Sequence, residues 1–129
     1  GRLNFPSGDM VGHTGHLHAT IEAMEVIDEC MALLIDVIDE LGGVIIYTAD
    51  HGNADVMYTI DAAGDKHPKT SHTLSPVPFA IHDPNYDGEY RMVDAAPGDA
   101  HGLANVAATV LNLLGFDAPD DYLQPLITF

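Results

Sequence analysis

The sequence predicts an α/β fold with a mainly parallel sheet, and three observations support this class. Apolar residues recur at helical spacing over 16–41 and stop at the paired glycines 42–43. The β-branched, apolar run 44–48 follows directly and has the composition of a buried strand. The third observation is the Asp-His-Gly sequence at 50–52, because ligands of open α/β sheets bind at the carboxyl ends of strands.

Composition bounds the partners that the chain can bind. Its 129 residues are 47% hydrophobic, which is enough for one domain with a core and argues against disorder. Four Lys+Arg against twenty Asp+Glu give a formal charge of -16. A nucleic-acid partner and an anionic membrane surface are both disfavoured, because each needs a basic protein surface.

Cysteine usage and the chain ends indicate the setting. Cys30 is the single cysteine, so no intrachain disulfide can form, and the sequence contains no signal peptide or apolar span of membrane length. These features predict a reducing, cytoplasmic setting. The chain starts without Met and enters a candidate ligand loop at once, so we expect it to be a piece of a longer polypeptide.

The predicted elements follow in order. Residues 3–5 are interpreted as the end of a strand and 6–8 as a turn. The helix over 16–41 carries its apolar residues in one stripe. Because a helix followed by a strand is half of a βαβ unit, 3–5 and 44–48 are expected to be parallel neighbours.

The second half of the chain has weaker patterns. Residues 52–70 are predicted to be irregular and exposed, with a loop tip near 64–68. A short strand over 77–81 is assigned to a sheet edge by its prolines. A helix is predicted over 103–114, and the tail 117–129 is expected to pack over the surface, with no internal domain boundary.

Three stretches carry residues that bind divalent metals. Asp9 and His13 are four residues apart, which suits one helical turn or a tight loop. Asp50 and His51 are adjacent and can share a metal only if the chain turns after them. His72 lies in a loop before the edge strand. Two carboxylates and three imidazoles suit Mn²⁺ or Zn²⁺, and carboxylates favour Mn²⁺. Taken singly, each stretch is also explained by a surface pair, a turn or an ordinary loop histidine.

The same stretches carry a family resemblance. Residues 9–15 (Asp-Met-Val-Gly-His-Thr-Gly), 48–55 (Thr-Ala-Asp-His-Gly-Asn-Ala-Asp) and 69–79 (beginning Lys-Thr-Ser-His-Thr) resemble the C-terminal part of cofactor-independent phosphoglycerate mutases, in the alkaline phosphatase superfamily. The resemblance continues through 105–115. It implies that 1–129 is the C-terminal part of a three-layer αβα, alkaline-phosphatase-like metal-binding domain. The nucleophile segment and a second domain would lie upstream.

The resemblance also implies a reaction and a set of ligands. Enzymes of this family interconvert 3-phosphoglycerate and 2-phosphoglycerate in glycolysis and gluconeogenesis, through a phosphoserine and two Mn²⁺ ions, for which Zn²⁺, Co²⁺ or Mg²⁺ can substitute. The implied first metal site consists of Asp9, His13 and His72. The implied second site contains Asp50 and His51 and is completed by an upstream Asp and the nucleophilic Ser. The residues expected to support these ligands are Asn53 and Asp55.

The remaining polar residues are given structural roles. Ser7, Ser71 and Ser75 do not lie in the family's nucleophile context, so the isolated chain is predicted to be inactive. The basic side chains are too few for a phosphate clamp. Helix capping or loop positions are expected for His16, His18, His67, His82 and His101. Two alternatives remain open: another metal-dependent phosphatase or phosphomutase of the superfamily, and a non-catalytic metal-binding module.

Overall fold

The computed structural model describes residues 1–94 and 101–129. These residues form two compact units, Gly1–Asn85 and Tyr86–Phe129. The expectation of no internal boundary was therefore wrong. Residues on the two sides of position 85 make most of their contacts within their own unit. The amino-acid composition does not change at this point, so the sequence gives no sign of the boundary. No helix in the described part of the chain combines the length and apolar character that crossing a membrane requires.

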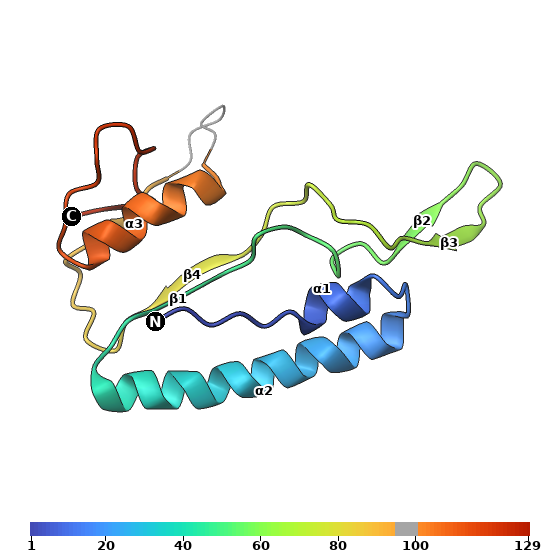
Figure 1. Ribbon diagram of the computed structural model, residues 1–129, viewed down its shortest axis with the longest axis horizontal. Helices are drawn as coiled ribbons and strands as arrows, with labels where there is room; N and C mark the ends of the chain where they lie inside the picture. The colour runs from blue at the N-terminus through green and yellow to red at the C-terminus, as the bar shows by residue number, and fades with distance from the viewer. Residues whose placement is uncertain (95–100) are drawn as a thin grey trace. The chain divides into compact units, whose positions relative to one another are not determined.

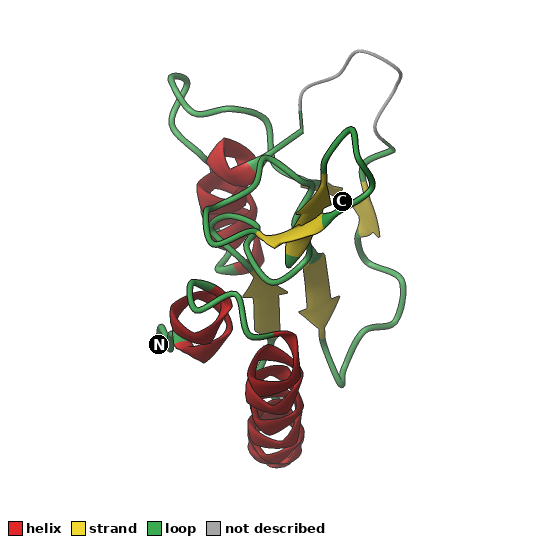
Figure 2. Cartoon of the chain, turned by 90° about the vertical axis from the view of Figure 1, so that its right-hand side faces the viewer, coloured by secondary structure: helices red, strands yellow, loops and turns green. Residues whose placement is uncertain are grey.

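Two helices begin the first unit and lie side by side (Figures 1 and 2). Helix α1 spans Ser7–Gly12, and helix α2 spans Leu17–Leu41. The side chain of His16 caps α2 by accepting a hydrogen bond from the backbone N of Ala19 at 3.2 Å. Gly42 ends the helix in the left-handed conformation, with φ 61°, which a residue without Cβ adopts at no steric cost. The predicted helix is confirmed to within one residue.

The sheet of this unit corrects the predicted topology. Strand β1, Ile45–Thr48, pairs with β4, Phe79–His82, in antiparallel register, with Ile46 opposite Ile81. Residues 3–5 form no strand, so the expected parallel pair with β1 was wrong. All three sheets of the described chain are two-stranded and antiparallel, which confirms strands and helices but not a mainly parallel, three-layer arrangement. The rule for βαβ units assumed a complete first strand, and this chain offers only a few residues before α1.

A hairpin stands where irregular chain was predicted. Strand β2, Tyr58–Ile60, pairs with β3, Lys66–Pro68 (Figure 1). The carboxylate of Asp61 accepts hydrogen bonds from the backbone N of Ala63 and of Asp65, both at 2.9 Å. This local turn sets the register of strands that are fully exposed and therefore lack an alternating hydrophobic signal.

The core of the first unit lies where the apolar stripe of α2 faces β1 and β4. Ile27 is buried there, and Met31, Ile35 and Ile45 line the same space. Much apolar surface of α2 stays exposed, including Leu33 and Val37. Together these elements hold the loops after α1, β1 and β3, which carry the polar residues described below.

The second unit is built around a short helix. Its elements are β5 (Arg91–Met92), a 3-10 turn η1 (Leu103–Asn105), α3 (Val106–Leu113) and β6 (Ile127–Thr128). Thr109 is fully buried, and its Oγ1 accepts from the backbone N of Leu126 at 2.8 Å. The predicted helix is confirmed, although its first turn is 3-10. The tail does not simply cover the surface, because β6 pairs with β5.

Candidate metal centre

Three of the predicted ligands converge on one point. Asp9 lies in α1, His13 ends that helix one turn later, and His72 comes from the loop between β3 and β4. Oδ1 of Asp9 lies 3.2 Å from Nε2 of His13 and 3.1 Å from Nε2 of His72. The two Nε2 atoms are 3.1 Å apart, so one carboxylate oxygen and two imidazole nitrogens surround a common point.

A backbone carbonyl fixes the orientation of His13. Its Nδ1 lies 2.6 Å from the carbonyl oxygen of Thr70, which can only accept, so the imidazole proton sits on Nδ1. Nε2 then presents a lone pair toward Asp9 Oδ1, which is also an acceptor. While the imidazole is neutral, these two acceptors 3.2 Å apart need a cation between them, and a second proton on Nε2 or a metal ion can fill that role. Carboxylate oxygen and imidazole nitrogen, with the other imidazole nitrogen bonded to a carbonyl, form the donor set of a divalent metal site, so these residues fit such an ion.

Asn53 supports Asp9 through hydrogen bonds. Its side chain is buried, and its Nδ2 donates to Oδ1 of Asp9 at 2.6 Å and to the backbone carbonyl of Asp9 at 3.3 Å. This hydrogen bond is the main reason that the pKa of Asp9 is lowered, and the nearby imidazoles of His13, His72 and His51 lower it further. Asp9 therefore keeps its negative charge in this environment.

The second predicted pair lies beside the first cluster without joining it. The ring of His51 stacks on that of His72, with centroids 3.7 Å apart and an interplanar angle of 20°. Oδ1 of Asp50 is 3.6 Å from Nε2 of His51, and the Asp50 side chain is 90% exposed. Nδ1 of His51 is buried without a hydrogen-bond partner and lies 3.9 Å from Asp9 Oδ1. Asp50 and His51 thus form a separate, open pair.

Asp55 ties the two histidine loops together. Oγ1 of Thr73 lies 3.0 Å from both carboxylate oxygens of Asp55, and the backbone N of Thr73 donates to the carbonyl of Gly52 at 2.8 Å. The pKa of Asp55 is lowered chiefly by a hydrogen bond from Ser75, then by Thr73 and by the charge of Lys69. The role of Thr73 was missed by sequence reasoning, since its partners lie about twenty residues away and leave no local signal.

Most of the other histidines have structural partners, as expected. His16 caps α2, and His18 lies edge-on to it, with ring centroids 6.5 Å apart. Nε2 of His67 is 2.8 Å from Oδ2 of Asp61, and Nε2 of His82 is 2.6 Å from Oδ1 of Asp39. The contacts of His16, His67 and His82 each occupy an imidazole nitrogen away from the cluster.

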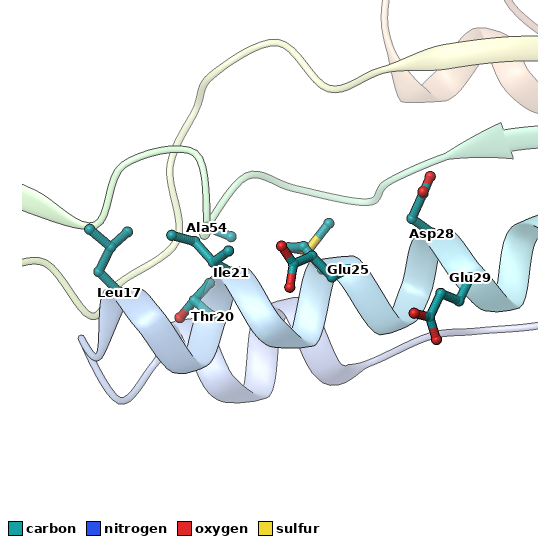
Figure 3. A pocket seen from close by; sticks show the side chains of 8 residues that line it. Leu17, Thr20, Ile21, Glu25, Asp28, Glu29 and Ala54 are labelled. Atoms are coloured by element: carbon teal, nitrogen blue, oxygen red, sulfur yellow. The ribbon is translucent and has the colours of Figure 1, made fainter.

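A hollow along α2 has the wrong charge for an anionic ligand. Figure 3 shows its lining, in which the side chains of Glu25, Asp28 and Glu29 extend from one stretch of the helix. Three carboxylates repel an anionic ligand, so this hollow does not suit one.

Comparison with known proteins assigns this arrangement to a class. Residues 2–118 match the model of the metalloenzyme superfamily, so the chain belongs to that superfamily. Within it, the chain is similar to the 2,3-bisphosphoglycerate-independent phosphoglycerate mutases. It is 45% identical over 98% of its length to the probable mutase of Leptospira interrogans. It is 48% identical over 98% of its length to the mutase of Ricinus communis.

A solved structure has the same fold as this chain. The phosphoglycerate mutase of Leishmania mexicana, determined at low cobalt concentration, matches 98% of the chain with a TM-score of 0.89 and 51% identity. The chain spans 24% of that structure and 24% of each of the two curated relatives. At this identity and coverage the likeness extends to nearly every described element.

Proposed function

We propose that this chain supplies the C-terminal metal-binding part of a cofactor-independent phosphoglycerate mutase. The reaction is the interconversion of 3-phosphoglycerate and 2-phosphoglycerate through a phosphoserine, in glycolysis and gluconeogenesis. The observation that carries the proposal is the convergence of Asp9 Oδ1 with the Nε2 atoms of His13 and His72. Sequence identity of 45–48% to enzymes named as such mutases supports the substrate.

Two divalent ions are part of the proposal. Asp9, His13 and His72 would hold one ion. Asp50 and His51 would supply two ligands of the second ion, and an Asp and the nucleophilic Ser of the upstream polypeptide would supply the others. We favour Mn²⁺ for the mixed oxygen and nitrogen ligands, with Zn²⁺, Co²⁺ or Mg²⁺ as substitutes. When bound, such ions lower the pKa of a serine hydroxyl and neutralise phosphoryl oxygens.

The protein's own contribution is to hold its ligands in place before the ions bind. Asn53 keeps Asp9 ionised and aimed at the cluster. The carbonyl of Thr70 holds the proton of His13 on Nδ1, which leaves Nε2 free. The stacked ring of His51 limits the rotation of His72. Ligands held in this way lose little conformational freedom on binding.

Catalysis would require the rest of the polypeptide. The upstream part supplies the serine, the other ligands and the groups that grip phosphoglycerate, so we expect the isolated chain to be inactive. The proposed partners are therefore this upstream part and the substrate, with no nucleic acid and no membrane, in the cytoplasm.

The test is mutation of the ligands in the full-length protein. His13→Ala and Asp50→Ala should each lower bound metal, measured by mass spectrometry, and lower mutase activity by more than the roughly 10–100-fold that loss of an outer partner costs. His67→Ala is the matched control, because that imidazole pairs with Asp61 on the hairpin. Unchanged metal content and activity in both ligand variants would show that the assignment is wrong.

The superfamily match leaves one competing enzyme class. The family model that matches describes a superfamily, and the chain spans 24% of its relatives' length. Another metal-dependent phosphatase or phosphomutase would use the same cluster. Turnover of a generic phosphomonoester faster than 3-phosphoglycerate would favour that class, and metal binding without turnover of either would favour a non-catalytic module.

A further inference from the structure

Lys69 makes an unusual set of hydrogen bonds beside the cluster. Its Nζ donates to the backbone carbonyl of Ser71 at 2.7 Å, to Oγ of Ser71 at 2.9 Å and to the backbone carbonyl of His72 at 3.1 Å. A lysine ammonium has three protons, and all three are directed into the loop that carries His72. A lysine saturated in this way has no donor left for a phosphate group.

Loop 69–72 is exposed, and its supports besides Lys69 are the His51 ring stacked on His72 and the hydrogen bonds of Thr73 at its end. Thr70, Ser71 and His72 are exposed, so burial adds little to their stability. The backbone of Lys69 is anchored, because its N donates at 3.0 Å to the carbonyl of Met57, which is buried. Lys69 therefore connects a fixed point at the base of the hairpin to the exposed tip of the loop.

Both imidazoles of the cluster depend on this loop. His72 belongs to it, and the carbonyl of Thr70, which orients His13, lies between Lys69 and Ser71. A shift of the loop would move Nε2 of His72. It would also break the hydrogen bond between Nδ1 of His13 and the carbonyl of Thr70. Displacements of about 1 Å at such supports are enough to lower the occupancy of a site.

We propose that Lys69 is a positioning residue for the metal centre: its ammonium clamps loop 69–72 so that His72 and the carbonyl of Thr70 stand ready around Asp9. The proposal rests on the proposed function, because it takes Asp9, His13 and His72 as metal ligands. It assigns to Lys69 no contact with substrate, which separates it from a phosphate-binding lysine.

The test uses the full-length protein and Co²⁺ as the probe, because its visible absorption reports coordination geometry. Lys69→Met keeps the aliphatic stem and removes all three donors. It should weaken Co²⁺ binding by about 10–100-fold and change the absorption band, while KM for 3-phosphoglycerate stays within about twofold at saturating metal. Lys66→Met is the matched control, since that ammonium lies 4.5 Å from the centre of the Tyr58 ring, and it should leave both readouts unchanged.

The outcomes separate this inference from the proposed function. If His72→Ala abolishes one Co²⁺ site but Lys69→Met binds Co²⁺ like the wild type, the positioning role is refuted and the metal site stands. A raised KM with unchanged Co²⁺ binding would also refute it and indicate a substrate contact. If His72→Ala has no effect on Co²⁺ or activity, both proposals fall.

A second variant guards against misfolding of Lys69→Met, which circular dichroism would reveal. Ser71→Ala removes only the Oγ acceptor and leaves both carbonyl contacts of Lys69. It should weaken Co²⁺ binding in the same direction by about threefold, in line with the loss of one hydrogen bond. No loss of affinity in a folded Ser71→Ala protein would count against the clamp.

Discussion

Replacement of Gly12 by Ala separates helix propensity from support of the metal centre. A Cβ at position 12 would lie 2.6 Å from Oδ1 and 3.0 Å from Cγ of Asn53. The Asn53 side chain is buried and cannot retreat freely, so it must turn away from Asp9. Its 2.6 Å hydrogen bond to Oδ1 of Asp9 is then lost.

The two effects of this change have opposite signs. Gly→Ala in a helix stabilises by up to about 1 kcal/mol, and less at the last residue of α1. Loss of a hydrogen bond to a charged group costs about 1.5–3 kcal/mol. The loss is larger, so Gly12→Ala should lower the free energy of unfolding by about 1–2 kcal/mol, raise the pKa of Asp9 and weaken Co²⁺ binding by about 10–100-fold.

The assay pairs Co²⁺ titration with denaturant unfolding of the full-length protein. Gly8→Ala is the matched control on the same helix, because its one close contact would be Sδ of Met24 at 2.8 Å, at the flexible end of a side chain, with Cδ1 of Ile27 at an ordinary 3.8 Å. This control should be neutral or slightly stabilised and should bind Co²⁺ normally. A Gly12→Ala protein that is as stable as the wild type and binds Co²⁺ equally well would refute the reasoning.

Three further predictions concern supporting contacts. Thr73→Val removes the hydroxyl that contacts the carboxylate of Asp55, so the free energy of unfolding should fall by about 1 kcal/mol at neutral pH. The pKa of Asp55 is lowered in the folded chain, so its stabilisation is complete above the ordinary value of 3.8 and is lost as pH falls through the folded pKa. The difference between wild type and Thr73→Val in urea unfolding should accordingly shrink below that pH, and a difference independent of pH would contradict the assignment. Gly52→Ala places a Cβ against Oγ1 of Thr73 and should break the bridge between the two histidine loops, with a cost of about 2 kcal/mol in thermal unfolding and a loss of His51–His72 contacts in nuclear magnetic resonance spectra. In the second unit, Thr109→Val leaves the buried backbone N of Leu126 without an acceptor and should cost about 1–3 kcal/mol, whereas Thr109→Ser, which keeps the hydroxyl, should cost less.

Elements with a strong local pattern were predictable from the sequence. The apolar stripe and the paired glycines located α2 to within one residue, because burial of one helix face imposes that spacing. The β-branched run predicted β1, and Asp50 and His51 follow at the carboxyl end of that strand. The candidate ligands were found by residue type and by the family resemblance, since chemistry restricts which side chains bind metals.

Features that depend on distant partners could not be predicted. The antiparallel pairing of β1 with β4 joins segments about thirty residues apart. The exposed hairpin of β2 and β3 has no hydrophobic alternation, so only the Asp61 turn marks it. The support of His13 by a carbonyl leaves no trace in residue identity, because every residue has that group.

The glycines beside the ligands illustrate why a motif is more than its ligands. Gly12 directly precedes His13, and Gly52 directly follows His51. Neither has a positive φ, so backbone conformation alone does not require glycine at these positions. A Cβ at either position would instead strike a side chain that supports the site, Asn53 in one case and Thr73 in the other. The requirement for glycine is therefore set by the supporting residues, and a larger residue at 12 or 52 becomes tolerable only if its supporting side chain is shortened as well. Gly12→Ala combined with Asn53→Ala should thus cost little more than Asn53→Ala alone, a non-additivity that a double-mutant cycle measures directly.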